Sequence, residues 1–266
     1  MSTLYQPFQP TLTAGGLHRF GMSLQLADSS APLRNVVHSY LQISVDKPTP
    51  YPVMPDATQA IYISTEGSFI AGAYNQSFEF PLLERGEYFG IWFYPGALRK
   101  LFELDLQEIT NQFADTGFLP CTQFATLHDR IYQQTQFSQR VKQCDQWVLS
   151  HLREMPTDRF DQALALIYKA RGTLKVEQLA NQIGWSRRHL NRMFRSNTGL
   201  STQAFCQTIR RQHACLDLYR TPTNSLNTAI ELGYYDQAHL LNDYKKHLQA
   251  SPGSIANRFM SDFYNP

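Results

Sequence analysis

The residues with the clearest chemistry lie between Trp185 and Arg195, in the sequence WSRRHLNRMFR. At about 100° per residue, one flank of a helix built from this segment carries Arg187, Arg188, Asn191, Arg192 and Arg195. The other flank carries the apolar residues Leu190, Met193 and Phe194. Guanidinium and amide groups bond phosphates and base edges, so the first flank predicts recognition of an anion.

Uncompensated positive charge distinguishes this segment from an ordinary solvated helix face. Such faces usually mix acids with bases, so that pairs three or four residues apart offset the repulsion. Between Trp185 and Asn197 there is no acidic residue, and like charges this close lower the stability of the helix itself. A bare solvated face is the alternative, but we expect an external anion to neutralise the flank.

Positive charge is also concentrated in the C-terminal part of the chain as a whole. Residues 1–156 hold 10 Lys and Arg against 14 Asp and Glu, a net charge of −4. Residues 157–266 hold 14 against 8, a net charge of +6, within a total of +2 for the chain. A basic half of this kind favours a negatively charged partner, most often nucleic acid.

Two short helices must position the arginines. Apolar residues recur at helical spacing from Val176 to Ile183, and Gly184 follows where a helix C-terminus is expected. Ser186 is a favourable N-cap for the next helix, which carries the arginines. Two helices joined so closely predict a helix-turn-helix unit whose second helix enters the major groove of DNA.

A second copy of this unit follows about fifty residues later along the chain. The matched pairs are Ala180 with Ala229, Gly184 with Gly233 and, after one inserted residue, His189 with His239, Leu190 with Leu240 and Phe194 with Tyr244. The segment from Ser201 to Arg220 between the copies contains no helix breaker, so it predicts one long helix. Such a spacer would hold two reading helices at a fixed separation, suited to successive major-groove segments roughly 34 Å apart.

Residues from about 160 to 259 resemble the DNA-binding domain of the AraC/XylS family of transcription regulators. The resemblance rests on LA…G(W)S…HL.R.F…TG.S in the first unit, on A.ELGY.DQAH…YKKHL..SP in the second, and on Arg210 in the linking helix. Position by position, it implies base-edge contacts from Arg188, Asn191, Arg192, Gln237, His239 and Asn242. It implies phosphate contacts from Arg187, Arg195, Lys245 and Lys246, which add affinity without sequence choice.

The second unit departs from the family pattern. Asn242 stands where the family usually has an arginine, and the outer face of this unit is less basic. We therefore expect the first reading helix to dominate sequence discrimination.

The first part of the chain has the pattern of a β-rich domain. Short segments rich in Tyr, Phe, Ile and Val are separated by glycine and proline, which predicts a sheet or a partial, cupin-like barrel. Pro95-Gly96 predicts a strand-to-helix junction. Apolar residues from about Cys121 to Leu152 recur at helical spacing, and we expect this helical stretch to cover the sheet rather than the equivalent stripe of a partner.

The expected fold class is therefore α+β, with the domain boundary near Pro156 and a cap at Thr157 or Asp158. Residues 1–155 would form an N-terminal β-rich domain with flanking helices, for effector binding or dimerisation. Residues 156–266 would form an all-α domain with two helix-turn-helix units joined by a long helix.

The N-terminal part also resembles a domain of unknown function found in many regulators of the same family. The resemblance rests on a turn at Pro55-Asp56-Ala57, where the usual glycine is missing, and on an intact turn at Pro95-Gly96-Ala97. It implies a sensing or dimerising module without identifying a ligand. An apolar pocket could be lined by Tyr62, Tyr74, Phe78, Phe80, Trp92 and Tyr94, although aromatic rings often simply fill a core.

Composition excludes several classes of protein. The 266 residues, 42% apolar and 17% charged, suffice for two domains, and no run approaches the roughly 18 apolar residues of a membrane span. No signal peptide is recognisable, so we expect a cytoplasmic protein without membrane contact. Cys121, Cys144, Cys206 and Cys215 form no metal or disulfide pattern, and no catalytic constellation is visible, so we expect no cofactor, no metal and no enzymatic activity.

The sequence thus predicts a DNA-binding transcription regulator whose first domain responds to a small effector, a partner protein or a second copy of the chain. RNA polymerase and a homodimer partner are further expectations. One alternative is a DNA-binding adaptor that a protein partner controls through residues 121–152, with no small ligand. Another is a DNA-repair enzyme with a borrowed reader domain, but this needs a cysteine-rich metal site that Cys121 and Cys144 do not supply.

Overall fold

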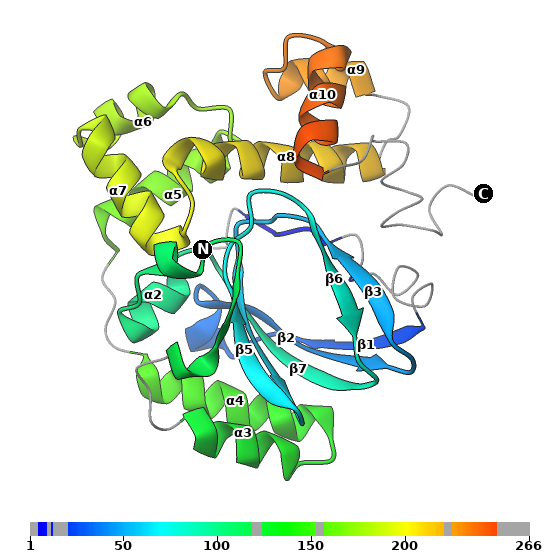
Figure 1. The fold of residues 1–266 in the computed structure, drawn as a ribbon. Helices are drawn as coiled ribbons and strands as arrows, with labels where there is room; N and C mark the ends of the chain where they lie inside the picture. Colours follow the sequence, from blue (N-terminus) through cyan, green and yellow to red (C-terminus); the bar gives the residue numbers. More distant parts are fainter. Residues whose placement is uncertain are drawn as a thin grey trace.

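The computed structural model describes residues 5–9, 12, 21–118, 124–152, 157–220 and 225–248. A curved antiparallel sheet lies over two helices, and a further group of helices lies at one end of the sheet (Figure 1). Within the described residues, no helix has the length and apolar character needed to cross a membrane. The α+β fold class, with a β-rich first part and a helical second part, is confirmed.

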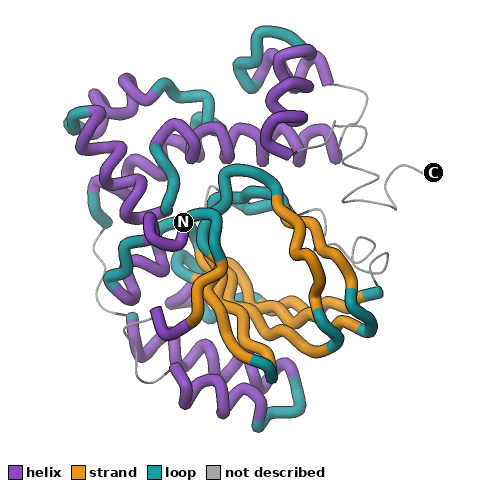
Figure 2. The backbone as a smooth tube through the Cα atoms, in the orientation of Figure 1, coloured by secondary structure: helices purple, strands orange, loops and turns teal. Residues whose placement is uncertain are grey.

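The larger sheet is six-stranded, with all pairs antiparallel and the strand order β1-β2-β7-β4-β5-β8. Its strands are β1 (Met22–Ala27), β2 (Val37–Val45), β7 (Gly86–Phe93), β4 (Gln59–Ser64), β5 (Gly67–Ala71) and β8 (Phe113–Asp115). A separate antiparallel pair, β3 (Thr49–Val53) and β6 (Phe78–Leu83), stands opposite the inner face of this sheet (Figure 2). The two sheets together form the expected partial barrel.

The strand residues alternate between two buried faces, as the pleat of a strand requires. Ile61, Ile63 and Ile91 face outward into a core with α2 (Ala97–Phe102), α3 (Phe124–Tyr132) and α4 (Phe137–His151). Tyr62 and Trp92 face inward, with a second apolar cluster from β1 and β2. The inner face is therefore the one on which a ligand cavity can form.

The helical stretch predicted over residues 121–152 is two helices rather than one. The helix is interrupted between Tyr132 and Phe137, where the chain turns. The two helices α3 and α4 therefore pack against each other beneath the sheet. Their apolar stripe covers the sheet of the same chain, as expected. Arg140 of α4 is nearly buried, and its guanidinium donates to Gln42 at 2.7 Å and to Glu87 at 2.8 Å.

Two tight turns fall at the motifs noted in the sequence. Gly96 has a φ of +85° at the start of α2, which explains the strand-to-helix junction. Ala57 has a φ of +62°, so the position where the related domains have glycine does adopt the left-handed conformation, here with a methyl side chain. Single turns of 3-10 helix complete this part: η2 (Ala31–Leu33), η3 (Leu106–Ile109) and η4 (Thr116–Phe118).

The second part of the chain is helical throughout its described residues. Its helices are α5 (Arg159–Lys169), α6 (Val176–Ile183), α7 (Arg187–Thr198), α8 (Thr202–Arg220), α9 (Ser225–Glu231) and α10 (Gln237–Leu248). The carboxylate of Asp158 caps α5, in a capping box with Asp161. The predicted long helix is α8, whose 19 residues span about 28 Å, with α6–α7 at one end and α9–α10 at the other (Figure 1).

The cysteines that the structure describes lie in the helical regions. Cys144, Cys206 and Cys215 are free and buried, and Cys121 lies outside the described residues.

The C-terminal end of α7 docks on the β-rich part through backbone carbonyls. The amide of Gln59 donates to the carbonyl of Thr198 at 3.3 Å, and the hydroxyl of Thr110 donates to the carbonyl of Gly199 at 2.8 Å. Gly199 has a φ of +80°, and a Cβ there would lie 2.7 Å from Thr110 Oγ1 and 2.9 Å from the carbonyl oxygen of Leu106. This junction therefore needs glycine for two separate reasons, its conformation and its close approach.

Replacing Gly199 by alanine tests this junction. Gly184 is the matched control because its φ is +71° but no atom lies within 4 Å of an added Cβ. We expect Gly184→Ala to lower the free energy of unfolding by about 1 kcal/mol, the cost of the left-handed conformation alone. Gly199→Ala should lower it by at least about 2 kcal/mol, because the methyl group also collides with η3. Equal losses in urea unfolding followed by circular dichroism would show that α7 does not dock on η3 in solution.

Candidate nucleic-acid interface

Helix α7 has the two-sided character predicted for a reading helix. Ser186 caps its N-terminus by accepting from the N–H of His189 at 3.2 Å, and Gly184 ends the preceding helix with a φ of +71°. Leu190 and Phe194 have no exposed surface and seat the helix on a core with α5, α6 and α8. The side chains on the opposite flank, Arg187, Arg188, Arg192 and Arg195, are all exposed.

Arg192 is partly held in place by its neighbours. Its guanidinium lies 3.0 Å from Nδ1 of His189, and the His189 ring packs edge-on against Trp185 with a centroid separation of 4.7 Å. A neutral His189 accepts this bond through Nδ1 and leaves the remaining N–H groups of Arg192 available. This contact reduces the rotamer entropy that Arg192 would lose on binding a base.

Asn191 differs from the arginines beside it. It is half-buried, and its side-chain oxygen accepts from the backbone N–H of Thr202 at 3.1 Å. Thr202 is the first residue of α8, where the N–H has no acceptor within the helix. Asn191 therefore joins α7 to α8 through its oxygen, and its NH2 group carries no bond to α8. The predicted base contact stays a prediction.

Helix α10 repeats the construction of α7. Asp236 caps it by accepting from the N–H of His239 at 2.7 Å, in the place that Ser186 takes before α7. Gly233 has a φ of +69°, and both Leu240 and Tyr244 have no exposed surface. The predicted repeat is thus confirmed in cap, turn and core.

The predicted contact residues of α10 lie on its outer side. Those that are exposed are Gln237, His239, Asn242, Lys245 and Lys246. Nδ1 of His239 accepts from the backbone N–H of Tyr235 at 3.2 Å, and its ring lies edge-on against Tyr234. The two reading helices therefore each place a histidine in the same position, supported by the aromatic residue at the preceding turn.

The second unit is tied to α8 by charged groups below the surface. Arg210 lies over the ring of Tyr234, 4.3 Å from its centroid, and the Tyr234 hydroxyl donates to Asp243 at 2.8 Å. Arg211 has a 3% exposed side chain and lies 3.5 Å from Asp243. Burial lowers the pKa of Arg211, and the Asp243 carboxylate opposes that effect. Arg210, one of the residues behind the family resemblance, thus contacts the second unit from the linking helix.

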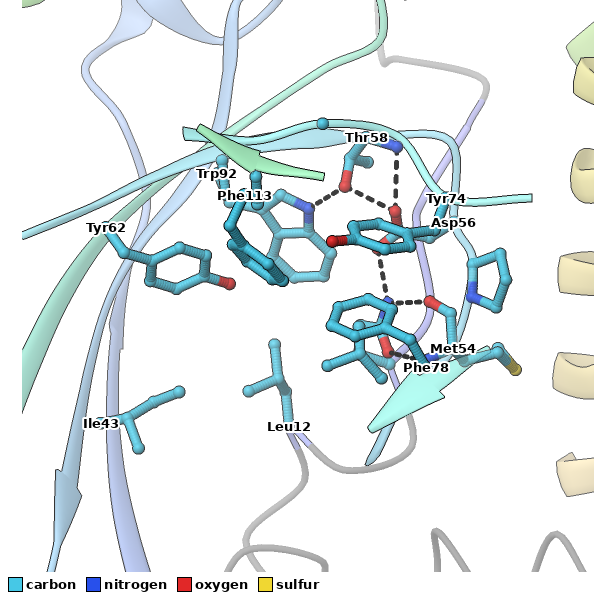
Figure 3. A pocket seen from close by; sticks show the side chains of 16 residues that line it. Leu12, Ile43, Met54, Asp56, Thr58, Tyr62, Tyr74, Phe78, Trp92 and Phe113 are labelled. Atoms are coloured by element: carbon cyan, nitrogen blue, oxygen red, sulfur yellow. Dashed lines mark hydrogen bonds between the residues drawn. The ribbon is translucent and has the colours of Figure 1, made fainter. Parts of the chain in front are cut away.

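A cavity lies on the inner face of the sheet, next to the helical part (Figure 3). Its volume is about 60 Å³ for the centre of a water-sized sphere. Its lining consists of Gln9, Leu12, Ile43, Val53, Met54, Pro55, Asp56, Thr58, Ala60, Tyr62, Ala71, Gly72, Tyr74, Phe78, Trp92 and Phe113. Four of the six predicted lining residues are among them: Tyr62, Tyr74, Phe78 and Trp92.

Tyr94 is not among the residues that line this cavity. Strand β7 ends at Phe93 and the chain turns at Pro95, so Tyr94 leaves the alternation that directs Trp92 inward. It packs instead against His38, with ring centroids 5.4 Å apart. The side chain of Phe80 lies outside the described part of the structure. Phe113, Leu12 and Asp56 were missed, and only the turn at Asp56 had a recognisable pattern.

The carboxyl group of Asp56 anchors the polar corner of the cavity. It accepts from the N–H and hydroxyl of Thr58 at 2.9 and 2.6 Å, and from the amide of Gln9 at 2.7 Å. The Thr58 hydroxyl accepts in turn from the indole N–H of Trp92, which fixes that ring. Burial raises the pKa of Asp56, although the hydrogen bonds from Thr58 and Gln9 oppose the shift.

The wall of the cavity also contacts the linking helix. The amide of Gln212 in α8 donates to the carbonyl of Pro55 at 2.8 Å, and its oxygen accepts from the N–H of Phe8 at 2.7 Å. Met54 packs with Cys215 and Leu218 of α8. Residues 54–56 therefore face the cavity on one side and the helix that carries both units on the other.

A second part of the wall reaches α10. Tyr74 and Phe78 line the cavity, and the turn between them holds the end of the helix. The N–H of Ser77 donates to the carbonyl of His247 at 2.8 Å, and Nδ1 of His247 lies 3.3 Å from the carbonyl oxygen of Asn75. Both reading helices thus have their C-terminal ends against the β-rich part and their N-terminal halves away from it.

Two family models match the chain. Residues 179–258 match a helix-turn-helix domain, and residues 27–115 match a domain of unknown function, DUF6597. The first match begins within α6 and runs past α10, and the second includes most of the cavity wall.

Curated relatives match about a third of this chain. The HTH-type transcriptional regulator MtrA of Neisseria gonorrhoeae is 32% identical over 88 residues, 33% of this chain and 29% of MtrA. An uncharacterized HTH-type transcriptional regulator of Haemophilus influenzae is 30% identical over 89 residues, 34% of this chain and 30% of that protein. The match thus spans less than a third of each relative. A structure of ToxT from Vibrio cholerae aligns with 89% of this chain and 99% of ToxT, at 10% identity and a TM-score of 0.42.

Asn191 and Arg188 test two different roles on α7: Asn191 bonds α8, and Arg188 is exposed on the outer flank. Asn191→Ala leaves the N–H of Thr202 without an acceptor, so we expect the free energy of unfolding to fall by about 1 to 2 kcal/mol. Arg188→Ala removes an exposed side chain and should change it by less than about 0.5 kcal/mol. Urea unfolding of both variants measures the difference. If Asn191→Ala is as stable as Arg188→Ala, the bond to α8 does not hold α7 in solution.

Proposed function

We propose that this chain, an AraC/XylS-family protein by its double helix-turn-helix region, binds specific DNA sequences and regulates transcription. One observation carries the proposal: two capped helices, each seated on fully buried side chains, share the rigid α8 and leave cationic or amide side chains exposed. An isolated helix-turn-helix would be weaker support, because short two-helix units occur in many proteins. Residues 156–266 would be the reader and residues 1–155 the sensor.

The exposed residues divide by chemistry. Arg188 and Arg192 would bond base edges bidentately, and Asn191 would contact a base beside them. On the second helix this role falls to Gln237, His239 and Asn242. The remaining cations, Arg187, Arg195, Lys245 and Lys246, would neutralise phosphates. Contacts with RNA polymerase and pairing of two copies are further expectations of this proposal.

The two reading helices should contribute unequally. The best duplex from a random-sequence selection serves as the probe, with fluorescence anisotropy as the measurement. We expect Arg192→Ala to weaken binding by about 1 to 3 kcal/mol and to relax preference at one position of the site. Asn242→Ala should cost less, because the second helix presents fewer cations. An equal or larger loss from Asn242→Ala would refute this ranking.

Arg195→Gln provides the control for a phosphate contact. It should weaken binding to all sequences alike and reduce the slope of log affinity against log salt by about 1. If no duplex is retained at low ionic strength by the unmodified protein, the DNA-binding proposal itself fails.

The contacts around the cavity support regulation by an effector. A ligand that shifts residues 54–56 or 74–78 acts directly on walls that hold α8 and α10. Such a ligand changes DNA affinity only by its differential affinity for the two arrangements. The adaptor alternative has less support, because the apolar stripe of α3 and α4 is already covered by the sheet.

Gln212 tests whether α8 holds the cavity wall. Gln212→Met keeps the length of the side chain but removes two hydrogen bonds, to Pro55 and Phe8. We expect amide hydrogen exchange in the peptide covering residues 54–58 to rise about tenfold, since each bond contributes about 1 kcal/mol. Gln203→Met, at an exposed position of the same helix, is the control and should leave that peptide unchanged. If hydrogen exchange in Gln212→Met is unchanged, α8 does not hold the cavity wall in place.

A further inference from the structure

The cavity is small but large enough for a compact ligand. Its volume of about 60 Å³ has room for a few water-sized groups. A trimethylammonium group is of this order of size.

The wall of the cavity is mainly aromatic. The five rings are Tyr62, Tyr74, Phe78, Trp92 and Phe113, and Figure 3 shows them gathered around one space. Tyr74 and Phe78 stack with centroids 3.8 Å apart, and they lie 5.7 and 5.4 Å from Phe113. The face of an aromatic ring carries partial negative charge and attracts a cation within about 6 Å of its centroid. Rings from β4, β6, β7 and β8 thus present an environment that favours positive charge.

The charge of the wall also favours a cation. Among the lining residues that the structure describes, Asp56 is the one charged side chain, and Lys, Arg and His are absent. Its oxygens accept hydrogen bonds from Thr58 and Gln9, which favour the ionised form and oppose the rise in pKa that burial causes. No ion pair to Asp56 occurs within the described residues. A buried carboxylate without a counter-ion is costly, so a cation in the cavity would stabilise it and an anion would be repelled.

The polar tips of the wall are also compatible with a cation. Burial raises the pKa of the Tyr62 and Tyr74 hydroxyls, so both stay neutral at physiological pH. The indole N–H of Trp92 is engaged by Thr58, so the ring does not use it as a donor toward the cavity. The wall therefore offers ring faces and two neutral phenolic hydroxyls, whose oxygens can accept from an ammonium N–H.

We propose that the cavity binds a small organic cation, of the alkylammonium class, between the aromatic rings and the carboxylate of Asp56. The inference rests on the proposed function in that this cation would be the effector of the regulator. Binding itself can be measured on the full chain without DNA, so failure of the cation proposal and failure of DNA binding are distinguishable.

Three probes of one shape and different charge test the proposal by isothermal titration calorimetry. They are choline, its neutral analogue in which a tert-butyl group replaces the trimethylammonium group, and the anion tert-butylacetate. We expect choline to bind about tenfold more tightly than the neutral analogue, because the two differ only in the charge at the centre of the rings. The anion should show no binding. A neutral analogue that binds as tightly as choline, or binding of none of the three, overturns the proposal.

Variants at Tyr74 assign the binding to the aromatic wall. Tyr74→Leu removes a ring face and should weaken choline binding at least fivefold, whereas Tyr74→Phe keeps the face and should bind choline within twofold of the unmodified protein. Ile43→Val, at a non-aromatic lining position, controls for a change in cavity volume. Equal choline affinity in the Leu and Phe variants would contradict an aromatic cation site.

Asp56→Asn tests the charge while keeping the shape of the side chain. Choline affinity should fall about tenfold and the affinity of the neutral analogue should not, which removes the preference for the cation. The melting temperature shows whether this variant folds, because Asp56 also holds the turn at Thr58. If the variant does not fold, the Tyr74 pair still decides the proposal. A preference for choline that survives in folded Asp56→Asn contradicts the role of the carboxylate.

Discussion

The packing of one helix, α8, is the constraint on which the rest of the structure depends. Its first half contributes Phe205 and Ile209 to the core of the first unit, and its second half contributes Ala214 and Leu218 to the core of the second. Between these halves Gln212 bonds the β-rich part. Two cores and a hydrogen bond to the β-rich part thus share one helix, so a movement of α8 affects all three contacts. Separation of the two reading helices, their docking and the shape of the cavity are consequences of this shared helix.

Local signals explain why so much of the helical part could be predicted. Gly184, Ser186, Gly233 and the apolar residues between them act within a few residues of their own position, and the second copy repeats them. The bond from Asn191 to Thr202 could not be predicted in this way. A helical wheel sorts residues by angle, and it places Asn191 beside the arginines without showing that another helix begins next to it.

For the β-rich part, the sequence predicted the kind of fold but not its details. Composition identified Tyr62 and Trp92 as aromatic residues that could line a pocket, but it does not show which face of a curved sheet encloses a cavity. Tyr94 lies outside the lining because strand β7 ends one residue earlier, at Phe93. Leu12 comes from outside the strand pattern, and the break between α3 and α4 has no glycine or proline to mark it. These features depend on tertiary packing, which the local pattern does not contain.

The way in which the reading helices are anchored has an electrostatic consequence. Thr198, Gly199 and His247 receive hydrogen bonds at their carbonyl oxygens, so the β-rich part satisfies the negative ends of the helix macrodipoles. The positive ends, each equivalent to roughly half an elementary charge, then point away from the protein toward any polyanion that approaches. At α7 the neutral cap Ser186 leaves this positive end without a counter-charge, whereas at α10 the carboxylate of Asp236 offsets it, so the attraction of a polyanion is stronger at α7.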